Sequence, residues 1–122
     1  MQVVLGDPAD QPGDLVVLPG RRQHELDERT VVVKAPRWKP PAGNENALAE
    51  AYRCAVAVAN GRGARSLVLP GILAVGVWPM EDVTRVALTV LMSTPGSARE
   101  VTIAVPTAAM LEVWAEALIR QP

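Results

Sequence analysis

The sequence has no phenylalanine and only one cysteine, one histidine and one tyrosine among its 122 residues. A single cysteine, Cys54, excludes a disulfide within the chain and any metal site that needs several Cys and His ligands. Because phenylalanine is absent, the core must be built from aliphatic side chains. Hydrophobic residues still make up 49% of the chain, so a packed interior is expected rather than disorder.

An excess of either charge is also missing, since 12 basic and 13 acidic side chains leave a formal net charge of −1. This balance argues against a general nucleic-acid binder and against docking to anionic membranes. The N-terminal residues lack a basic segment followed by an apolar one, and apolar runs fall far short of the ~20 residues of a membrane span. We therefore expect a single cytoplasmic domain, residues 1–122.

Short apolar runs alternate with amphipathic segments along the chain. Strands are predicted at residues 1–5, 14–18, 31–33, 66–69 and 101–105, and helices at 45–60, 80–92 and 107–120. We expect Pro19-Gly20 to close the second strand, and the charged stretch 21–29 to be a loop or a short amphipathic turn. The alternation after residue 31 predicts βαβ crossovers, hence an α/β fold with a mostly parallel mixed sheet and helices on both faces, in three layers.

Helix boundaries and faces follow from capping residues and from the spacing of apolar side chains. Asn44 is a candidate N-cap, Pro79 suits the first position of the second helix, and Thr107 suits the N-cap of the third. The first helix carries one stripe from Leu48 to Ala59 and an adjacent one that begins at Ala47, so a wide buried face is expected.

The order of several residues resembles the macro-domain family over nearly the whole chain. Family members show a buried strand that ends in Pro, a helix with Leu and Tyr four residues apart, a Ser-Ile-x-x-Pro-type strand, and a glycine-containing loop that closes on an aromatic-Pro pair. Gly6-Asp7 and residues 14–17 resemble the family's first two strands. The later matches are Pro36, Leu48, Tyr52, Ala59, Ser66, Leu67, Pro70, Ile72, Gly76, Trp78 and Pro79.

Two departures from the family pattern bear on function. Residues 18–21 stand where the family has an Asn-Ala-Ala-Asn segment, a triple-glycine loop and a helix, so this first pocket loop and helix are expected to be missing. De-ADP-ribosylating members depend on that segment, so the resemblance does not imply hydrolysis by their route. The phosphate loop is also one residue shorter and keeps one glycine, Gly76, where two are usual.

The strand-to-helix loop after residue 70 is the main candidate for ligand binding. A loop with little side-chain bulk lets backbone N–H groups approach a phosphate, and the following helix N-terminus adds a favourable field. The alternative interpretation of this loop is a tight crossing over the core, and Glu81 and Asp82 just beyond it would repel a phosphate. The residues predicted to bind ligand are Asp7, Gly71, Ala74, Val75, Gly76, Val77 and Trp78.

Three of the candidate side chains have two interpretations each. The resemblance implies that Asp7 accepts a hydrogen bond from an adenine amino group, whereas an aspartate in a turn also bonds to nearby backbone. Trp78 would stack on a base or pack between loop and helix. Trp38, between two basic residues, would bind a partner or a nucleotide, or else anchor its loop.

Catalytic and metal-binding sites are not indicated. His24 lies in a charged stretch without a neighbouring nucleophile, and Cys54 falls inside a predicted helix, so we expect a solvated imidazole and an inert thiol. The sequence thus favours a non-catalytic module that binds ADP-ribose or a related adenine nucleotide, with no cofactor. The alternative is a scaffold for protein contacts or homodimerisation, in which the missing segment exposes apolar surface around Leu18 and Leu73; an enzyme of another kind ranks last.

Overall fold

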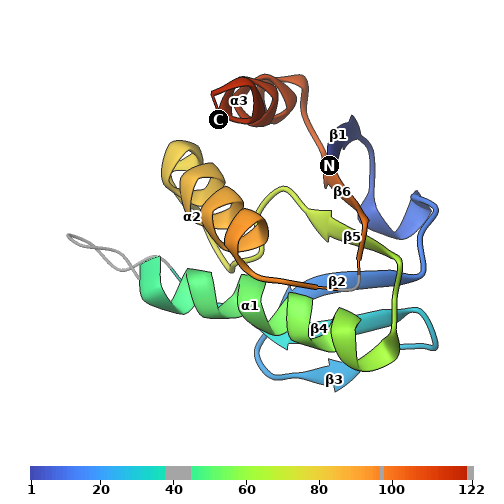
Figure 1. Cartoon of the computed structure of the whole chain (residues 1–122). Coiled ribbons are helices and arrows are strands. Elements are labelled where there is room, and N and C mark those ends of the chain that lie inside the picture. The colour runs from blue at the N-terminus through green and yellow to red at the C-terminus, as the bar shows by residue number, and fades with distance from the viewer. Residues whose placement is uncertain (38–44, 97, 121–122) are drawn as a thin grey trace.

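The computed structural model describes residues 1–37, 45–96 and 98–120. Within these residues lie one six-stranded sheet and three α-helices (Figure 1). Neighbouring strands are parallel except for the last pair, β4 and β3. The spatial order is β1 (Gln2–Leu5), β6 (Glu100–Val105), β5 (Ser66–Pro70), β2 (Leu15–Gly20), β4 (Thr30–Lys34) and β3 (His24–Glu25).

The three helices pack on one face of this sheet. They are α1 (Glu45–Arg62), α2 (Met80–Ser93) and α3 (Ala108–Ile119). Alternate residues of a strand point to the same face, and the strand residues that share one core with the helices are spaced in this way. That core joins Tyr52, Leu88 and Trp114 of the helices to Leu15, Val17, Val31, Val33, Leu67, Leu69, Ile103 and Val105 of the strands.

The opposite face is covered by the connection between β1 and β2. It contains a single 3-10 turn, η1 (Pro8–Asp10), which packs against β5 and β6. Gly13 lies directly over Val68, where an added Cβ would come within 2.8 Å of a valine methyl carbon. The side chain of Val68 is accordingly fully buried. This third layer is therefore a short irregular segment.

One arginine holds this connection in place. The guanidinium of Arg29, just before β4, donates to the carbonyl oxygens of Gly13 (2.8 Å), Ala9 (3.2 Å) and Gln11. These bonds satisfy three carbonyls of a segment that has few backbone partners of its own. Arg29 thus fixes the backbone that leads away from the end of β1.

The predicted α/β class, with a mixed and mostly parallel sheet in three layers, is confirmed, although the second outer layer is one 3-10 turn instead of helices. None of the helices in the described ranges is long and apolar enough to cross a membrane. The polypeptide passes from β2 to β4 through the short strand β3, without a helix between them. This is the place where the pocket loop and helix were expected to be missing.

The prediction that Pro19-Gly20 ends the second strand is wrong. The strand β2 runs on through Gly20, because Pro19 pairs with Val33 and Gly20 with Lys34. On its other side β2 pairs with β5 only at Leu15 and Val16. Pro19 therefore stands where one edge of the strand is open, which is where a residue without an N–H donor is tolerated.

The charged stretch 21–29 also differs from the expected loop. His24 and Glu25 form the antiparallel edge strand β3 against β4. The turn between them is stabilised by Asp27, whose Oδ1 accepts from the amides of Arg29 (2.9 Å) and Thr30 (2.8 Å). The hydrogen bond from the Arg29 amide is the main cause of a lowered pKa of the Asp27 carboxyl.

The helices agree closely with their predicted faces and caps. The stripe from Leu48 to Ala59 is buried, but Ala47 is exposed, so the second stripe is narrower than expected. Pro79 is the N-cap of α2 and not its first helical residue. Thr107 caps α3 as predicted, since its hydroxyl accepts from the amide of Met110 (3.2 Å). The expected cap Asn44 lies outside the described residues.

Candidate functional site

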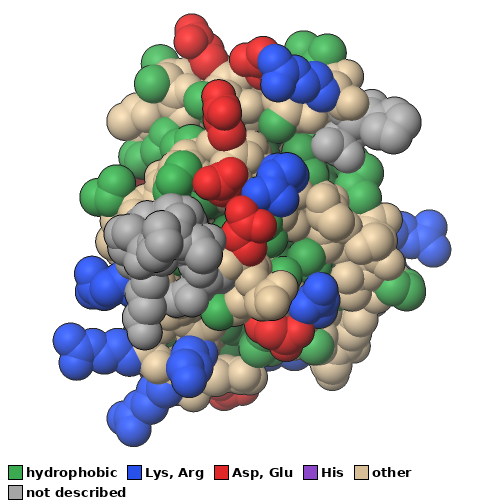
Figure 2. Space-filling view, turned by 90° about the vertical axis from the view of Figure 1, so that its left-hand side faces the viewer, with side chains coloured by type: hydrophobic (Ala, Val, Ile, Leu, Met, Phe, Trp, Pro, Cys, Tyr) green, Lys and Arg blue, Asp and Glu red, His purple; other side chains and the backbone are tan. Residues whose placement is uncertain are grey.

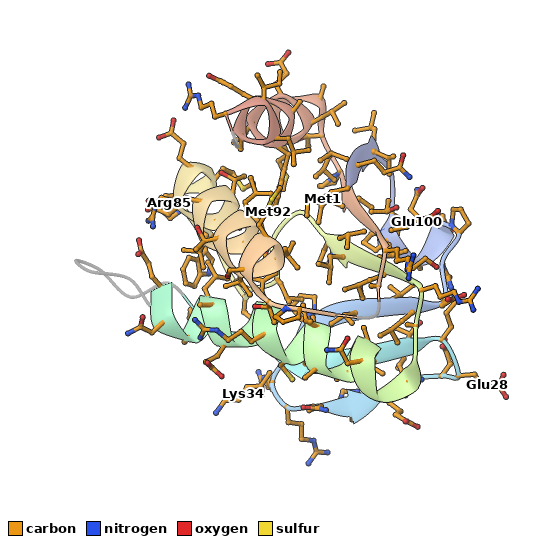
Figure 3. All side chains as sticks on the ribbon, in the orientation of Figure 1. Met1, Glu28, Lys34, Arg85, Met92 and Glu100 are labelled. Carbon is orange, nitrogen blue, oxygen red and sulfur yellow. The ribbon has the colours of Figure 1, made fainter. Side chains whose placement is uncertain are left out.

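The carboxyl ends of the five parallel strands lie at one edge of the sheet. Figure 3 shows this polarity: Lys34, the last residue of β4, lies to the left, whereas Glu28 and Glu100, which precede β4 and begin β6, lie to the right. Ligands of open α/β sheets bind outside the carboxyl ends of the strands. The candidate site residues all follow such an end, Asp7 after β1 and the others after β5.

A cleft of about 570 Å³ opens where β1, β6 and β5 end, and we call it the strand-end cleft. Its wall is largely apolar and includes one ionisable side chain, that of Asp7. Such a wall with few polar groups is typical of small-molecule sites. The lining residues are Leu5, Gly6, Asp7, Pro8, Pro70, Gly71, Ile72, Ala104, Pro106 and Met110.

Asp7 occupies the mouth of this cleft as the N-cap of η1. Its Oδ1 accepts from the amide of Ala9 at 2.9 Å, which is the local backbone bond expected of a turn aspartate. Within the described chain, Oδ2 makes no hydrogen bond to another residue. The cap therefore orients the carboxylate and leaves one oxygen for a donor in the cleft.

Gly71 belongs to the same cleft, but its backbone polar groups are used within the protein. Its amide donates to the carbonyl of Ala104 (3.0 Å), and its carbonyl accepts from the indole N–H of Trp114 (3.1 Å). An added Cβ would lie 2.8 Å from both a Met110 and a Val105 side-chain carbon. Gly71 contributes shape to the cleft, because α3 packs too closely for a larger residue.

Residues 71–79 form the connection that we call the β5–α2 loop, and a hydrogen bond ties this loop to α1. The amide of Leu73 donates to the hydroxyl of Tyr52 at 3.3 Å, and both residues are fully buried. Burial raises the pKa of Tyr52 well above its ordinary value, so the hydroxyl stays protonated. The amide of Val75 donates to the carbonyl of Pro36 (2.8 Å), which joins the loop to the segment after β4.

The loop side chains divide into a buried set and an exposed tip. Ala74 and Trp78 are buried, and the indole N–H of Trp78 donates to the carbonyl of Val75 (3.2 Å). The side chain of Trp78 is thus packed inside the protein, which agrees with the interpretation that it packs between loop and helix. Gly76 and Val77 form the tip, where Val77 is 90% exposed and Gly76 has a φ of +84°. A positive φ of this size favours glycine.

The loop tip also contacts a side chain that the sequence did not single out as a ligand. Arg37 forms a parallel bridge with Val75, and its guanidinium lies over Gly76. No local pattern could have identified this contact, because it joins residues of two loops that lie 39 positions apart in the sequence. Trp38, the neighbouring candidate, lies outside the described residues.

The expectation of exposed apolar surface around Leu73 is wrong. Its side chain is fully buried in the core beneath the loop, whereas Leu18 is half-buried. The tyrosine anchor explains the difference, since it draws the start of the loop inward. A main reason for proposing an uncovered interaction surface is thereby removed.

Acidic side chains surround the first turn of α2, as predicted, but they are partly neutralised. Arg85 pairs with Glu45 (2.6 Å) and with Asp82 (3.4 Å), and the hydrogen bond with Glu45 is the main reason that the pKa of Arg85 is raised. Figure 2, which views the edge where the strands end, shows a row of Asp and Glu side chains interleaved with Lys and Arg. The field at this edge is mixed in sign.

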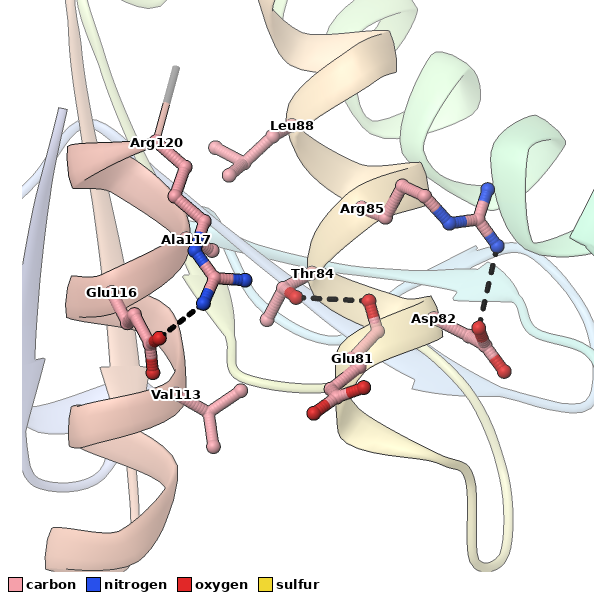
Figure 4. A pocket seen from close by; sticks show the side chains of 9 residues that line it. All are labelled: Glu81, Asp82, Thr84, Arg85, Leu88, Val113, Glu116, Ala117 and Arg120. Atoms are coloured by element: carbon pink, nitrogen blue, oxygen red, sulfur yellow. Dashed lines mark hydrogen bonds and ion pairs between the residues drawn. The ribbon is translucent and has the colours of Figure 1, made fainter.

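A second hollow, of about 410 Å³, lies between α2 and α3 (Figure 4). Four of its five charged side chains form two ion pairs within it, Asp82 with Arg85 and Glu116 with Arg120. It contains none of the predicted ligand residues. The strand-end cleft is therefore the better candidate site.

Catalytic groups are not assembled at this edge among the residues described. Cys54 donates to the side-chain oxygen of Gln23 (3.2 Å), and burial together with the charge of Glu50 raises its thiol pKa. His24 is exposed, with Nδ1 3.1 Å from the carbonyl oxygen of Arg22. A search of the same residues for three or more grouped His, Cys, Asp or Glu side chains finds no metal site.

Known proteins resemble this chain in sequence and in fold. No protein-family model matches the chain. A macro domain-containing protein of Streptomyces nogalater is 35% identical over 80 residues, which are 63% of this chain and 44% of that protein. The macro domain-containing protein SCO6450 of Streptomyces coelicolor is 32% identical over 97 residues, 77% of this chain and 57% of that protein. The chain is similar in sequence to macro domain-containing proteins. It spans about half the length of these curated relatives.

Solved macrodomains share the fold of this chain at much lower identity. A macrodomain of Oceanobacillus iheyensis with ADP superposes with a TM-score of 0.80 at 15% identity, over 96% of this chain and 88% of that one. A Trypanosoma brucei macrodomain in complex with ADP-ribose superposes with a TM-score of 0.73 at 14% identity, over 95% and 68%. This likeness shows that the chain has the macrodomain fold.

Proposed function

We propose that this chain is a module that binds ADP-ribose or a related adenine nucleotide without catalysing a reaction. The observation that carries the proposal is the position of Asp7, a carboxylate held by its own turn at the mouth of an apolar cleft. The cleft lies at the carboxyl ends of parallel strands, where α/β sheets bind ligands.

The strand-end cleft suits a flat heterocycle with an amino group. Its volume of about 570 Å³ lies within the range of small-molecule pockets, and its apolar wall would bury the faces of an aromatic base. The second oxygen of Asp7 would accept a hydrogen bond from an exocyclic amino group. Adenine combines both properties, which is why we favour it over a purely apolar ligand.

The β5–α2 loop continues from this cleft and would contact the phosphates. Gly71 and Ile72 line the cleft, and the chain then leads to the exposed tip at Gly76 and Val77. The amides of those two tip residues have no acceptor among the residues described. Backbone N–H groups ahead of a helix N-terminus favour an anionic ligand. The solved macrodomains with ADP and ADP-ribose support the same class of ligand.

We propose that the site does not catalyse a reaction because its lining residues lack the groups that catalysis needs. Nucleophilic or acid–base catalysis needs a nucleophile and a base, or two carboxyl groups, within reach of the reacting bond. Asp7 is the ionisable group that lines the strand-end cleft, and Cys54 is held as a protonated thiol by its environment.

Calorimetric titration with ADP-ribose, ADP and AMP tests the proposal. We expect binding by the wild-type chain and an affinity about tenfold lower for Asp7→Asn, which keeps an oxygen to cap η1 but replaces the free acceptor by a donor. The matched control is Asp10→Asn, which removes an equal charge from the same turn and should bind as wild type. No heat at millimolar ligand, or equal binding by the two variants, would contradict the proposal.

A further inference from the structure

The contact between Arg37 and the β5–α2 loop is the feature that goes furthest beyond the family resemblance. Arg37 follows β4, and it is placed beside the loop by the bridge to Val75 and by the hydrogen bond from the Val75 amide to the carbonyl of Pro36 (2.8 Å). This backbone bridge, which includes that hydrogen bond, fixes the position of Arg37 relative to the loop tip. Backbone pairing, and not only the length of its side chain, brings Arg37 to the loop.

The guanidinium lies close against the one residue of the tip that has no side chain. A Cβ placed on Gly76 would be 3.2 Å from Nη1 of Arg37, 3.8 Å from its Cγ and 4.0 Å from its Cζ. The aliphatic part and the guanidinium therefore both cover Gly76. Since Gly76 also has a φ of +84°, glycine is favoured here both by the backbone conformation and by the arginine above it.

This arrangement combines two kinds of anion donor on one exposed surface. Arg37 itself is exposed, and the amides of Gly76 and Val77 lie beside it without an acceptor among the described residues. A guanidinium presents a planar fork of donors that matches a phosphate group, and backbone amides add further donors. Of the two acidic side chains in the first turn of α2, Asp82 is already paired with Arg85.

We propose that Arg37 is the phosphate-recognising side chain of this site and makes it selective for a diphosphate over the uncharged nucleoside. This inference rests on the proposed function, since it assigns the diphosphate of an ADP-type ligand to the loop tip. Arg37 acts by direct contact with phosphate oxygens, while the strand-end cleft holds the base. A nucleoside without phosphates would bind independently of Arg37.

Calorimetric titrations of the full chain with adenosine, ADP and inorganic pyrophosphate test this division of the site. For Arg37→Gln we expect the dissociation constants of ADP and pyrophosphate to rise by about tenfold or more, and that of adenosine to stay unchanged. Arg37→Lys should recover only part of the loss, because it keeps the charge without the planar fork. Arg99→Gln, a matched loss of charge at the amino end of β6, should bind all three ligands as wild type.

Unchanged binding of ADP and pyrophosphate by Arg37→Gln would overturn the proposal, and so would an equal loss of adenosine binding, which would indicate a structural role. The two proposals fail separately. If wild type binds pyrophosphate through Arg37 but not adenosine, the nucleotide function fails and the role of Arg37 stands. If ADP binds equally well without Arg37, the reverse holds, and if no ligand binds, both are overturned.

Discussion

Replacing Tyr52 with phenylalanine is expected to destabilise the protein by releasing the β5–α2 loop from α1. The ring is retained, so the change removes little more than the hydroxyl that accepts from the Leu73 amide at 3.3 Å. Both residues are fully buried, and the amide would be left without a partner in the interior. Such an orphaned donor costs about 1–3 kcal/mol. Because the bond is long, we expect the lower half of that range, about 1–2 kcal/mol.

Denaturant unfolding and thermal melting would measure this cost. A loss of about 1–2 kcal/mol corresponds to a fall in Tm of about 3–8 °C for a chain of this length. The matched control is Thr84→Val, which also removes a buried hydroxyl. That hydroxyl donates to a helix carbonyl of Glu81 (3.1 Å), so its loss orphans no amide and should cost below about 0.5 kcal/mol. Equal stability changes for the two variants would refute the reasoning.

Three further predictions concern stability. Gly71→Ala should lower the free energy of unfolding by about 1–3 kcal/mol in denaturant titration, because the new methyl would overlap Met110; an unchanged midpoint would contradict this close packing. Arg29→Met should increase proteolysis within residues 6–14, because it releases the carbonyls of residues 9–13; unchanged cleavage would show that the clamp is dispensable. The raised pKa of Tyr52 means that the folded chain keeps its phenolic proton above about pH 10, where the unfolded chain loses it, so stability should fall as pH rises beyond that point. Since the chain has one tyrosine, ultraviolet titration should show tyrosinate only on unfolding, and ionisation near pH 10 in the native state would be the opposite result.

The buried strands could be predicted from the sequence. The apolar runs at β2, β4, β5 and β6 are covered on both faces, so their composition reports burial directly. The edge strand β3 was missed because His24 and Glu25 are both exposed and carry no apolar alternation. The predicted end of β2 at Pro19 was wrong because a proline interrupts a strand only where a partner strand needs its N–H. The sheet order decides where that is, and β5 does not pair with β2 at Pro19.

The candidate site was predicted in part for the same reason. Asp7 and Gly71 follow strands that end at one edge, so their proximity follows from a parallel sheet, and both line the strand-end cleft. The contact of Arg37 with Gly76 depends on how two loops meet, and no local pattern encodes it. Ligand binding by Asp7, Gly71 and the loop residues 74–78 stays a prediction.

The most direct test of the central claim is to map the binding site of ADP by backbone amide chemical shifts. The account predicts that saturating ADP shifts two groups of amides: Gly6 and Asp7 with Gly71 and Ile72 at the cleft, and residues 76–77 at the loop tip. Asp7→Asn should weaken the response of both groups together. No response at millimolar ADP, or shifts confined to the hollow between α2 and α3, would contradict the account.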